Sequence, residues 1–195
     1  MPQKPKGNIK EKIVLAALKC AAKDGWNKTG LADIAKAAKM SLSSLHEQFE
    51  DKADILAALE RMIDKKVLAA AGEGDASVPV RERLFDIMME RYDALNEYRT
   101  GLVSILDSFI LDPKQAVISL PHLCRSMTWM LEAAGVETSG IPGALRVSGL
   151  TALHLKVLYT WKSDESEDLS KTMAALDRDL SRLEQLGGLH TNSAG

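Results

Sequence analysis

Apolar residues recur at helical spacing along most of this 195-residue chain, from Ile9 to Leu183. No stretch shows the sustained alternation of β-branched and polar residues that is typical of a strand. Turn-forming residues separate the apolar stripes into segments of helical length. The pattern therefore predicts an all-α fold of about nine helices, spanning roughly residues 8–24, 30–38, 42–49, 52–70, 80–95, 100–112, 114–134, 144–161 and 164–186.

Residues 28–52, KTGLADIAKAAKMSLSSLHEQFEDK, predict two short helices joined by a tight turn. The first buries one face, formed by Leu31, Ile34, Ala35 and Ala38. Ser41 is a favourable N-cap for the second, and Leu45 and Phe49 form an inward i, i+4 pair. The outer faces then belong to Leu42, Ser43, Ser44, His46, Glu47 and Gln48. Such a helix suits insertion into a DNA major groove, although an ordinary helical hairpin within a bundle has the same spacing.

This segment resembles the helix-turn-helix of TetR-type transcriptional repressors, whose pattern is roughly I-A-x-x-A-G-V-S-x-G-x-L-Y-x-x-F-x-x-K. The positions that match it in register are Ile34, Ala35, Ala38, Met40, Ser41, Leu45, Phe49 and Lys52. Three positions depart from it, because Lys39 replaces the turn glycine, Ser43 a second glycine and His46 the tyrosine. Glu47 adds a negative charge to the same face.

The resemblance implies DNA binding through the outer face of this motif. Base edges would be read by Ser43, Ser44 and Gln48, because hydroxyls and amides both donate and accept hydrogen bonds there. Lys52 would hold a phosphate, and His46 a phosphate or a base. The complete set of expected DNA-binding residues is Thr29, Ser41, Leu42, Ser43, Ser44, His46, Glu47, Gln48 and Lys52. The expected partner is double-stranded DNA that carries a palindromic operator.

The charge of the chain is distributed unevenly. Residues 1–52 contain ten Lys and six Asp or Glu, a net charge of +4, whereas the remaining residues carry −6, for a total of −2. A basic N-terminal quarter fits a domain that faces DNA, and a solvated lysine-rich surface would give the same composition. The first helix is preceded by a basic arm, either disordered or tracking phosphates, that contains Lys4, Lys6, Lys10 and Lys12.

The sequence predicts a helix-turn-helix DNA-binding domain of residues 1–51, a helical regulatory and dimerisation domain of residues 52–186 and a disordered tail of residues 187–195. The tail is polar and rich in small residues. A turn-rich run, residues 71–79, separates the fourth helix from those that follow. Pro121 predicts a kink or a split within the seventh helix.

Methionine and aromatic residues occur throughout the fifth to eighth helices, where TetR-type proteins bind their effectors. The candidate pocket residues are Met88, Met89, Tyr92, Phe109, Met127, Trp129, Met130 and His154. Because Met adapts to irregular apolar shapes, they favour a small apolar ligand. The packing of an ordinary core predicts the same residues. On the fifth helix, Arg81 and Arg91 are expected to be solvated.

The last two helices contain features of a subunit interface. In the ninth helix, apolar residues alternate at spacings of four and three, as in an a/d seam, from Leu169 to Leu183. Asp164 and Glu167 form a capping-box pattern at its start. TetR-type proteins form a four-helix bundle from these helices and their copies, which implies a homodimer, and an intramolecular bundle is the alternative. The expected interface residues are Ser148, Gly149, Ala152, Leu169, Met173, Leu176 and Leu180.

No catalytic motif is present, because the chain lacks a P-loop and the G-x-G-x-x-G and G-x-S-x-G patterns. Its four histidines also lack metal-ligand spacing. An enzyme, a cofactor and a metal site are therefore not expected. The N-terminus lacks the apolar core of a signal peptide, and nowhere do 18 apolar residues run uninterrupted. These features predict a cytoplasmic protein without stable membrane insertion.

Residues 143–180 show a second resemblance, to the end of the TetR-fold ubiquinone-biosynthesis accessory proteins, which bind lipids and have lost the DNA-reading motif. It implies a lipid- or quinone-binding accessory protein as the alternative function. Here, however, Ser41, Leu45, Phe49 and Lys52 of the motif are retained. The principal hypothesis is therefore a TetR-like DNA-binding transcriptional regulator, a repressor that responds to a small apolar ligand.

Overall fold

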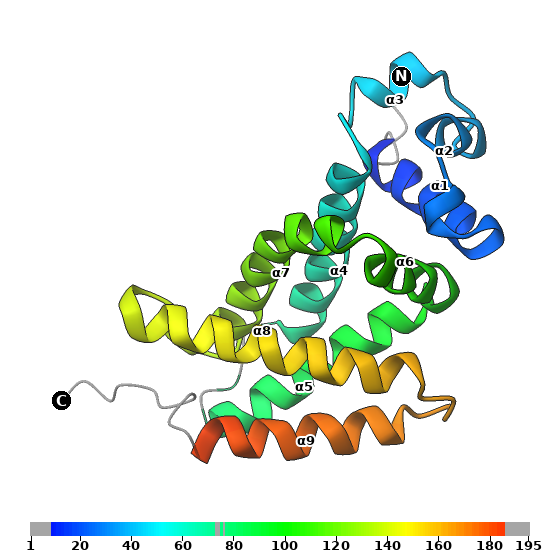
Figure 1. Ribbon diagram of the computed structural model, residues 1–195. Coiled ribbons are helices and arrows are strands. Elements are labelled where there is room, and N and C mark those ends of the chain that lie inside the picture. The colour runs from blue at the N-terminus through cyan, green and yellow to red at the C-terminus, as the bar shows by residue number, and fades with distance from the viewer. Residues whose placement is uncertain (1–8, 73–74, 76, 186–195) are drawn as a thin grey trace, which may run out of the picture. The chain divides into compact units, whose positions relative to one another are not determined.

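A computed structural model describes residues 9–72, 75 and 77–185. These residues form nine α-helices, one short 3-10 helix and no strand (Figure 1), which confirms the all-α prediction. The elements are α1 (Ile9–Asp24), η1 (Trp26–Lys28), α2 (Leu31–Ala37), α3 (Leu42–His46), α4 (Lys52–Ala71), α5 (Val80–Asn96), α6 (Arg99–Leu111), α7 (Pro113–Ala133), α8 (Gly140–Lys162) and α9 (Ser170–Gln185). The predicted arm residues Lys4 and Lys6 and the predicted tail of residues 187–195 lie outside the described residues.

The helices form two compact units, each made from two separate stretches of chain. The first unit comprises residues 1–63 and 95–122, and the second comprises residues 64–94 and 123–195. The first therefore adds the beginning of α4, all of α6 and the beginning of α7 to the helix-turn-helix segment. The predicted boundary between a DNA-binding domain and a regulatory domain after residue 51 stays a prediction.

In the first unit, α1 packs against both α6 and α2, and α2 packs against α3. The approach of α1 to α6 is closest at Gly101, where a Cβ atom would lie 2.6 Å from the carbonyl oxygen of Leu18. Any larger residue at this position would push the two helices apart. Glycine thus fixes the contact that supports the N-terminal helices.

In the second unit, α8 and α9 run antiparallel, side by side (Figure 1). Their contact is close at Gly149, where a Cβ atom would lie 3.0 Å from Cδ1 of Leu183. Val157 and Trp161 of α8 and Leu176 of α9 are each 0% exposed. These two helices therefore share an apolar core within one chain.

Two helix starts and one helix interior differ from the sequence prediction. α8 begins at Gly140, four residues early, and α9 begins at Ser170 rather than at the expected N-cap Asp164. Asp164 is 1% exposed, and its carboxylate accepts bonds from both the N–H and the hydroxyl of Thr172 at 2.8 and 2.7 Å. It therefore caps α9 from a loop that folds back. Of the kink or split expected at Pro121, the split does not occur, since α7 runs through Pro121 as one helix, and the kink stays a prediction.

Burial of Asp164 would raise the pKa of its carboxyl group, but hydrogen bonds from Ser166 and Thr172 outweigh that effect and lower the pKa. The carboxylate that caps α9 is therefore charged at neutral pH.

None of the helices described has both the length and the hydropathy needed to span a bilayer.

Candidate nucleic-acid interface and regulatory core

The turn between α2 and α3 is built from local backbone interactions. α2 ends in a Schellman motif, in which the Met40 N–H donates to the Ala35 carbonyl at 3.0 Å and Lys39 adopts a φ of 54°. Lys39 thus occupies a left-handed conformation that costs about 1–2 kcal/mol in a residue other than glycine. Ser41 then caps α3, because its Oγ accepts a bond from the Ser44 N–H at 3.1 Å. The predicted N-cap is confirmed.

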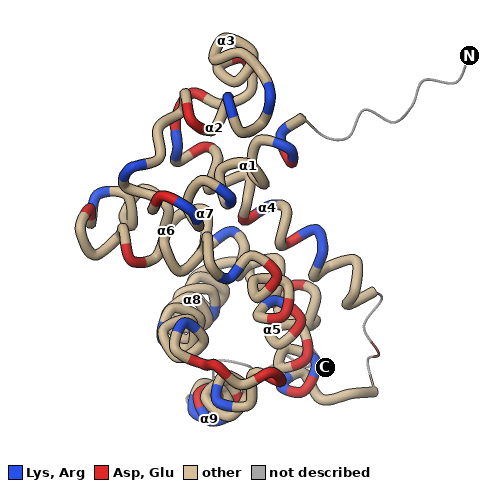
Figure 2. The backbone as a smooth tube through the Cα atoms, turned by 90° about the vertical axis from the view of Figure 1, so that its right-hand side faces the viewer, with Lys and Arg blue, Asp and Glu red and all other residues tan. Residues whose placement is uncertain are grey.

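Two inward side chains anchor α3, and its other side chains face solvent. Leu45 is 0% exposed and Phe49 is 3% exposed, as the i, i+4 spacing predicts. Gln48 is half-buried. The outward residues are Ser41, Leu42, Ser43, Ser44, His46 and Glu47. Ser43 and Ser44 therefore lie on one short helix, which itself carries neither Lys nor Arg (Figure 2), and Gln48 lies two positions beyond its end.

Acidic side chains gather at the C-terminal end of α3. A groove there is lined by Lys10, His46, Glu47, Gln48, Phe49, Glu50, Asp54 and Arg61. Three of these eight residues carry a carboxylate and two carry a cation, so the groove has mixed charge with a small acidic excess. In the part of the chain that the structure describes, no His, Cys, Asp or Glu group of three or more is arranged to hold a metal ion. Ser43 and Ser44 of the N-terminal end of α3 lie outside this groove, whereas Gln48, the third expected reading residue, lines it.

Two of the expected DNA-binding residues make contacts inside the first unit. Thr29 is 4% exposed, and its Oγ1 donates to the Gly25 carbonyl at 2.9 Å. The side chain of Thr29 is thus buried and its hydroxyl already bonded, and a DNA contact by this residue stays a prediction. Lys52 is half-buried, and its ammonium group donates to the carbonyl oxygens of Trp26 and Thr29 at 2.7 and 2.9 Å. A phosphate contact by Lys52 stays a prediction.

Trp26, the aromatic residue after Gly25, is a core residue and is 1% exposed. Its backbone N–H donates to Oγ of Ser104 at 2.9 Å, and its indole N–H donates to Oε1 of Gln115 at 3.4 Å. The Lys52 ammonium lies 4.2 Å from the centroid of its ring. Burial lowers the pKa of Lys52, and the charge of Asp112 partly opposes that shift. Trp26 thus links η1 to α4, α6 and α7.

Most of the predicted pocket residues belong to the core of the second unit. Five of them are at most 2% exposed, namely Met88, Tyr92, Met127, Met130 and His154. Met89 is half-buried, and Trp129 is 52% exposed on the outer face of α7. Phe109 belongs to the first unit. The first five residues form a methionine-rich core, and Trp129 is corrected to a surface position.

Tyr92 and His154 form a buried polar pair in this core. Tyr92 Oη lies 2.9 Å from Nδ1 of His154, and the two rings stack with centroids 5.4 Å apart. Burial, and after it the charge of Arg91, lowers the pKa of His154 well below its usual value. Burial raises the pKa of Tyr92. Both groups are therefore neutral at physiological pH, and they form a neutral hydrogen bond.

A buried ion pair is the feature that sequence reasoning missed. Arg91, expected to be solvated, has a side chain that is 0% exposed, and its Nη1 donates to Oδ1 of Asp64 at 2.6 Å. Ser126 Oγ donates to the same oxygen. The sequence did contain one sign of this pair, because Asp64 is a charged residue directly after Ile63 in the apolar stripe of α4. A buried carboxylate needs a partner, and Arg91 provides it.

The expected dimer residues separate into two groups. Leu169, Leu176 and Leu180 are at most 1% exposed within the single chain, and Gly149 packs against Leu183. Because α8 and α9 of one subunit already bury these residues, their contact with a second subunit stays a prediction. Ser148, Ala152 and Met173 are exposed. Only this second group is available to a partner.

A different apolar seam lies on the outer face of α8. Its large members are Ile141, Leu145, Leu155 and Tyr159, which are 80%, 68%, 46% and 75% exposed. With Ser148 and Ala152 between them, they alternate at spacings of four and three residues. We call these six residues the α8 stripe. A heptad-spaced apolar face that is this exposed is typical of a helix that packs against another helix.

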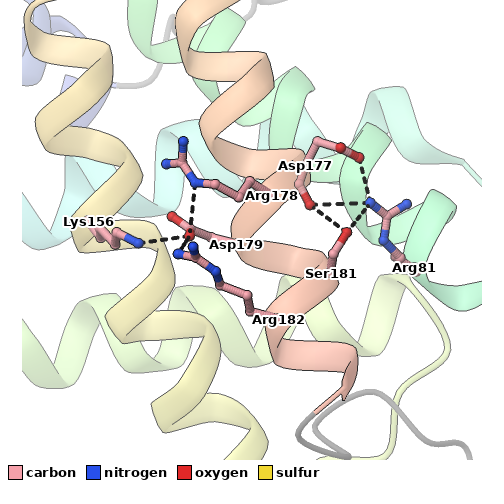
Figure 3. Close-up of polar contacts among 7 residues, drawn as sticks. All are labelled: Arg81, Lys156, Asp177, Arg178, Asp179, Ser181 and Arg182. Carbon is pink, nitrogen blue, oxygen red and sulfur yellow. Dashed lines mark hydrogen bonds and ion pairs between the residues drawn. The ribbon is translucent and has the colours of Figure 1, made fainter.

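A cluster of cations lies on α8 and α9 (Figure 3). Oδ1 of Asp179 accepts bonds from Lys156 at 2.8 Å and from Arg182 at 3.1 Å, and Arg178 Nε lies 3.5 Å away. Burial raises the pKa of Asp179, but the bonds and charges of Lys156 and Arg178 outweigh that effect and lower it. Three cations on one carboxylate leave a local charge of +2. Lys156 follows Leu155, so this charge borders the α8 stripe.

A family model described as bacterial regulatory proteins of the tetR family matches residues 13–59, which contain α2, α3 and most of α1. Among solved structures, a TetR transcriptional regulator from Nitrosomonas europaea superposes with a TM-score of 0.71 and 25% identity. The match covers 91% of this chain and 98% of that chain. No match was found among curated proteins.

Two structures at 18% identity share the fold. One is the fatty acid degradation regulator FadR from Bacillus halodurans, with a TM-score of 0.63 over 92% of this chain and 98% of that one. The other is FadR from Thermus thermophilus, a TetR-family transcriptional repressor in complex with lauroyl-CoA. Its TM-score is 0.58 over 95% of this chain and 97% of that one.

Proposed function

Because this chain belongs to the TetR family of transcriptional regulators, we propose that it is a repressor that binds a palindromic DNA site through α3. The observation that carries this proposal is the construction of α3. Leu45 and Phe49 are buried beneath it, whereas Ser43 and Ser44 face solvent at its N-terminal end. The N-terminal residues of a recognition helix are the ones that contact base edges in helix-turn-helix complexes.

Specificity would come from short polar side chains. The hydroxyls of Ser43 and Ser44 donate and accept hydrogen bonds, and Gln48 can pair with an adenine. His46 would contact a phosphate or a base from the same helix. Because α3 has no cation of its own, lysines elsewhere in the basic N-terminal quarter would supply the phosphate contacts. Lys39, in the turn before α3, is exposed and suits this role.

The repressor would act as a homodimer joined through the α8 stripe. The stripe has large residues at its ends and the small Ser148 and Ala152 at its middle, so two copies of α8 can cross closely there. Such a face is self-complementary about a two-fold axis, as an isologous interface requires. Two α3 helices would then meet half-sites about 34–36 Å apart, or a multiple of that distance.

The effector would be small and largely apolar, and it would bind in the core of the second unit. Met88, Met127 and Met130 offer an adaptable apolar surface, and the Tyr92–His154 pair offers one polar contact. A ligand would have to separate some of these packed side chains. The lipid-binding accessory function is not favoured, because the structures to which this chain is similar are transcriptional regulators.

Selection from a random duplex library by gel shift tests this proposal. We expect the selection to enrich a palindromic sequence. In the gel, the mobility of the protein–DNA complex should correspond to two chains bound per site. Mass spectrometry of material that co-purifies with the protein would identify the effector. A library that shows no enrichment would contradict the repressor function.

A further inference from the structure

Lys52 joins the two ends of the helix-turn-helix segment. It is the first residue of α4, six positions after the end of α3 and three positions after the buried anchor Phe49. Its ammonium group bonds to the carbonyl oxygen of Thr29, the residue before the N-cap of α2, 23 positions earlier in the chain. One side chain therefore closes the loop of sequence that contains both α2 and α3.

The acceptors of this ammonium group lie on the short turn η1. The Trp26 carbonyl accepts the Thr29 N–H at 3.2 Å and the Lys52 ammonium at 2.7 Å, and the Thr29 carbonyl accepts the same ammonium at 2.9 Å. A carbonyl oxygen has two lone pairs, so the Trp26 carbonyl can accept the Lys52 ammonium in addition to the Thr29 N–H. The ring of Trp26 adds an attractive surface 4.2 Å from the ammonium.

The acceptors are themselves held by the rest of the first unit. Trp26 donates to Ser104 of α6 and to Gln115 of α7. α6 is held against α1 by the close approach at Gly101. Lys52 therefore ties the end of the DNA-facing segment to a turn that cannot move independently of α1 and α6.

We propose that Lys52 is a positioning residue for DNA recognition, one that orients α2 and α3 by clamping η1 to α4 and does not contact phosphate. This inference rests on the proposed DNA binding by α3. An ammonium group has three N–H donors, and two of them are used here by backbone carbonyls. A phosphate contact would require Lys52 to give up a site in which it is already half-buried.

The salt dependence of DNA binding distinguishes positioning from phosphate contact. For Lys52→Met we expect binding to the selected palindrome to weaken at least about tenfold at every salt concentration, with the slope of log K against log salt unchanged. A slope lowered by about 0.9, the value for one released phosphate contact, would overturn the proposal. Lys39→Met, at an exposed position of the same motif, is the control. It shows how much the salt slope changes when a solvent-facing charge is lost.

Hydrogen exchange of the DNA-free protein tests the clamp without any DNA. In Lys52→Met we expect amide exchange across residues 26–37 to accelerate at least about tenfold, while α8 and the Lys39→Met control stay unchanged. Unchanged exchange in that segment would overturn the proposal. If the wild type binds no specific DNA, the repressor function fails, and this measurement still decides whether Lys52 holds the segment.

Circular dichroism will show whether the Met variant folds. If it does not, Lys52→Arg replaces it in the DNA-binding measurement. Arg keeps the charge and binds phosphate well, so a phosphate contact predicts affinity like that of the wild type. Its planar fork does not fit the site that an ammonium group occupies between two carbonyls and a ring. We therefore expect weaker binding with the full salt slope, and wild-type affinity would contradict the clamp.

Discussion

Arg91 and Asp64 form an ion pair inside the second unit, with Nη1 2.6 Å from Oδ1 and the arginine side chain 0% exposed. Ser126 donates to the same carboxylate oxygen, so α4, α5 and α7 meet at one acidic group. The arginine is also next to Tyr92, whose hydroxyl is bonded to His154. The core that we propose to hold the effector therefore contains buried polar groups as well as the apolar side chains of Met88, Met127 and Met130.

Arg91→Met should destabilise the protein strongly, because it leaves the Asp64 carboxylate buried without its cation. The expected loss is about 3–5 kcal/mol in the free energy of unfolding, measured by urea denaturation. Lys65→Met, at an exposed position on α4, is the matched control and should change stability by less than about 0.5 kcal/mol. The double variant Asp64→Leu/Arg91→Met should be more stable than Arg91→Met alone, and a further loss would contradict the pairing.

Acid should destabilise the folded protein through His154. Its pKa is lowered in the folded state, so the unfolded chain binds the proton first as the pH falls. Stability is then lost as the pH drops below about 6.5, the ordinary value for histidine, with a slope of at most about 1.4 kcal/mol per pH unit from this group. Denaturation of His154→Phe between pH 8 and 5 should show a smaller slope. The exposed His46→Gln is the control, and an equal effect in both variants would exclude this cause.

The helices could be predicted from the sequence because their apolar spacing is local. Ile34, Leu45 and Phe49 are buried as their positions on a helix indicate, and Ser41 caps α3 as its side chain suggests. The burial of Arg91 could not be predicted in the same way, because it depends on Asp64, 27 residues away. The position of Asp164 differed from the prediction for a similar reason. It was expected directly before α9, but it caps that helix from across a loop.

The subunit interface illustrates a second limit of sequence patterns. The α9 seam from Leu169 to Leu180 and the α8 stripe from Ile141 to Tyr159 have the same alternation of four and three. The spacing indicates that another helix packs there, but it does not say whether that helix belongs to the same chain. The exposure of the two seams differs, because Leu176 is 0% exposed and Tyr159 is 75% exposed, so the α8 stripe is the seam that we propose to pack against a second chain.

Variants of the two seams should therefore behave differently. Leu145→Glu/Tyr159→Glu places charges on the exposed α8 stripe and should give folded monomers, measured by sedimentation and circular dichroism. Leu176→Glu buries a charge in the core of the subunit and should unfold the second unit. Sedimentation of the double variant as a dimer would show that the stripe is not the interface.

Glu47→Gln should strengthen binding to all DNA sequences. Glu47 is the C-cap of α3, in a groove that also holds Glu50 and Asp54, at the opposite end of the helix from Ser43 and Ser44. Removing its charge should reduce repulsion from phosphates, with the largest gain at low salt. Gel shifts on the selected and on scrambled sites should show equal gains. A loss of discrimination would instead indicate that Glu47 accepts a bond from a cytosine.

Sequence-specific DNA binding is the central property to measure, by fluorescence anisotropy at ~150 mM salt. The wild type should bind the selected palindrome at least about 1,000-fold more tightly than a scrambled duplex of the same length. Ser43→Ala/Gln48→Ala should lose most of that ratio while retaining its affinity for scrambled DNA. Equal affinity of the wild type for the palindrome and the scrambled duplex would contradict the repressor function.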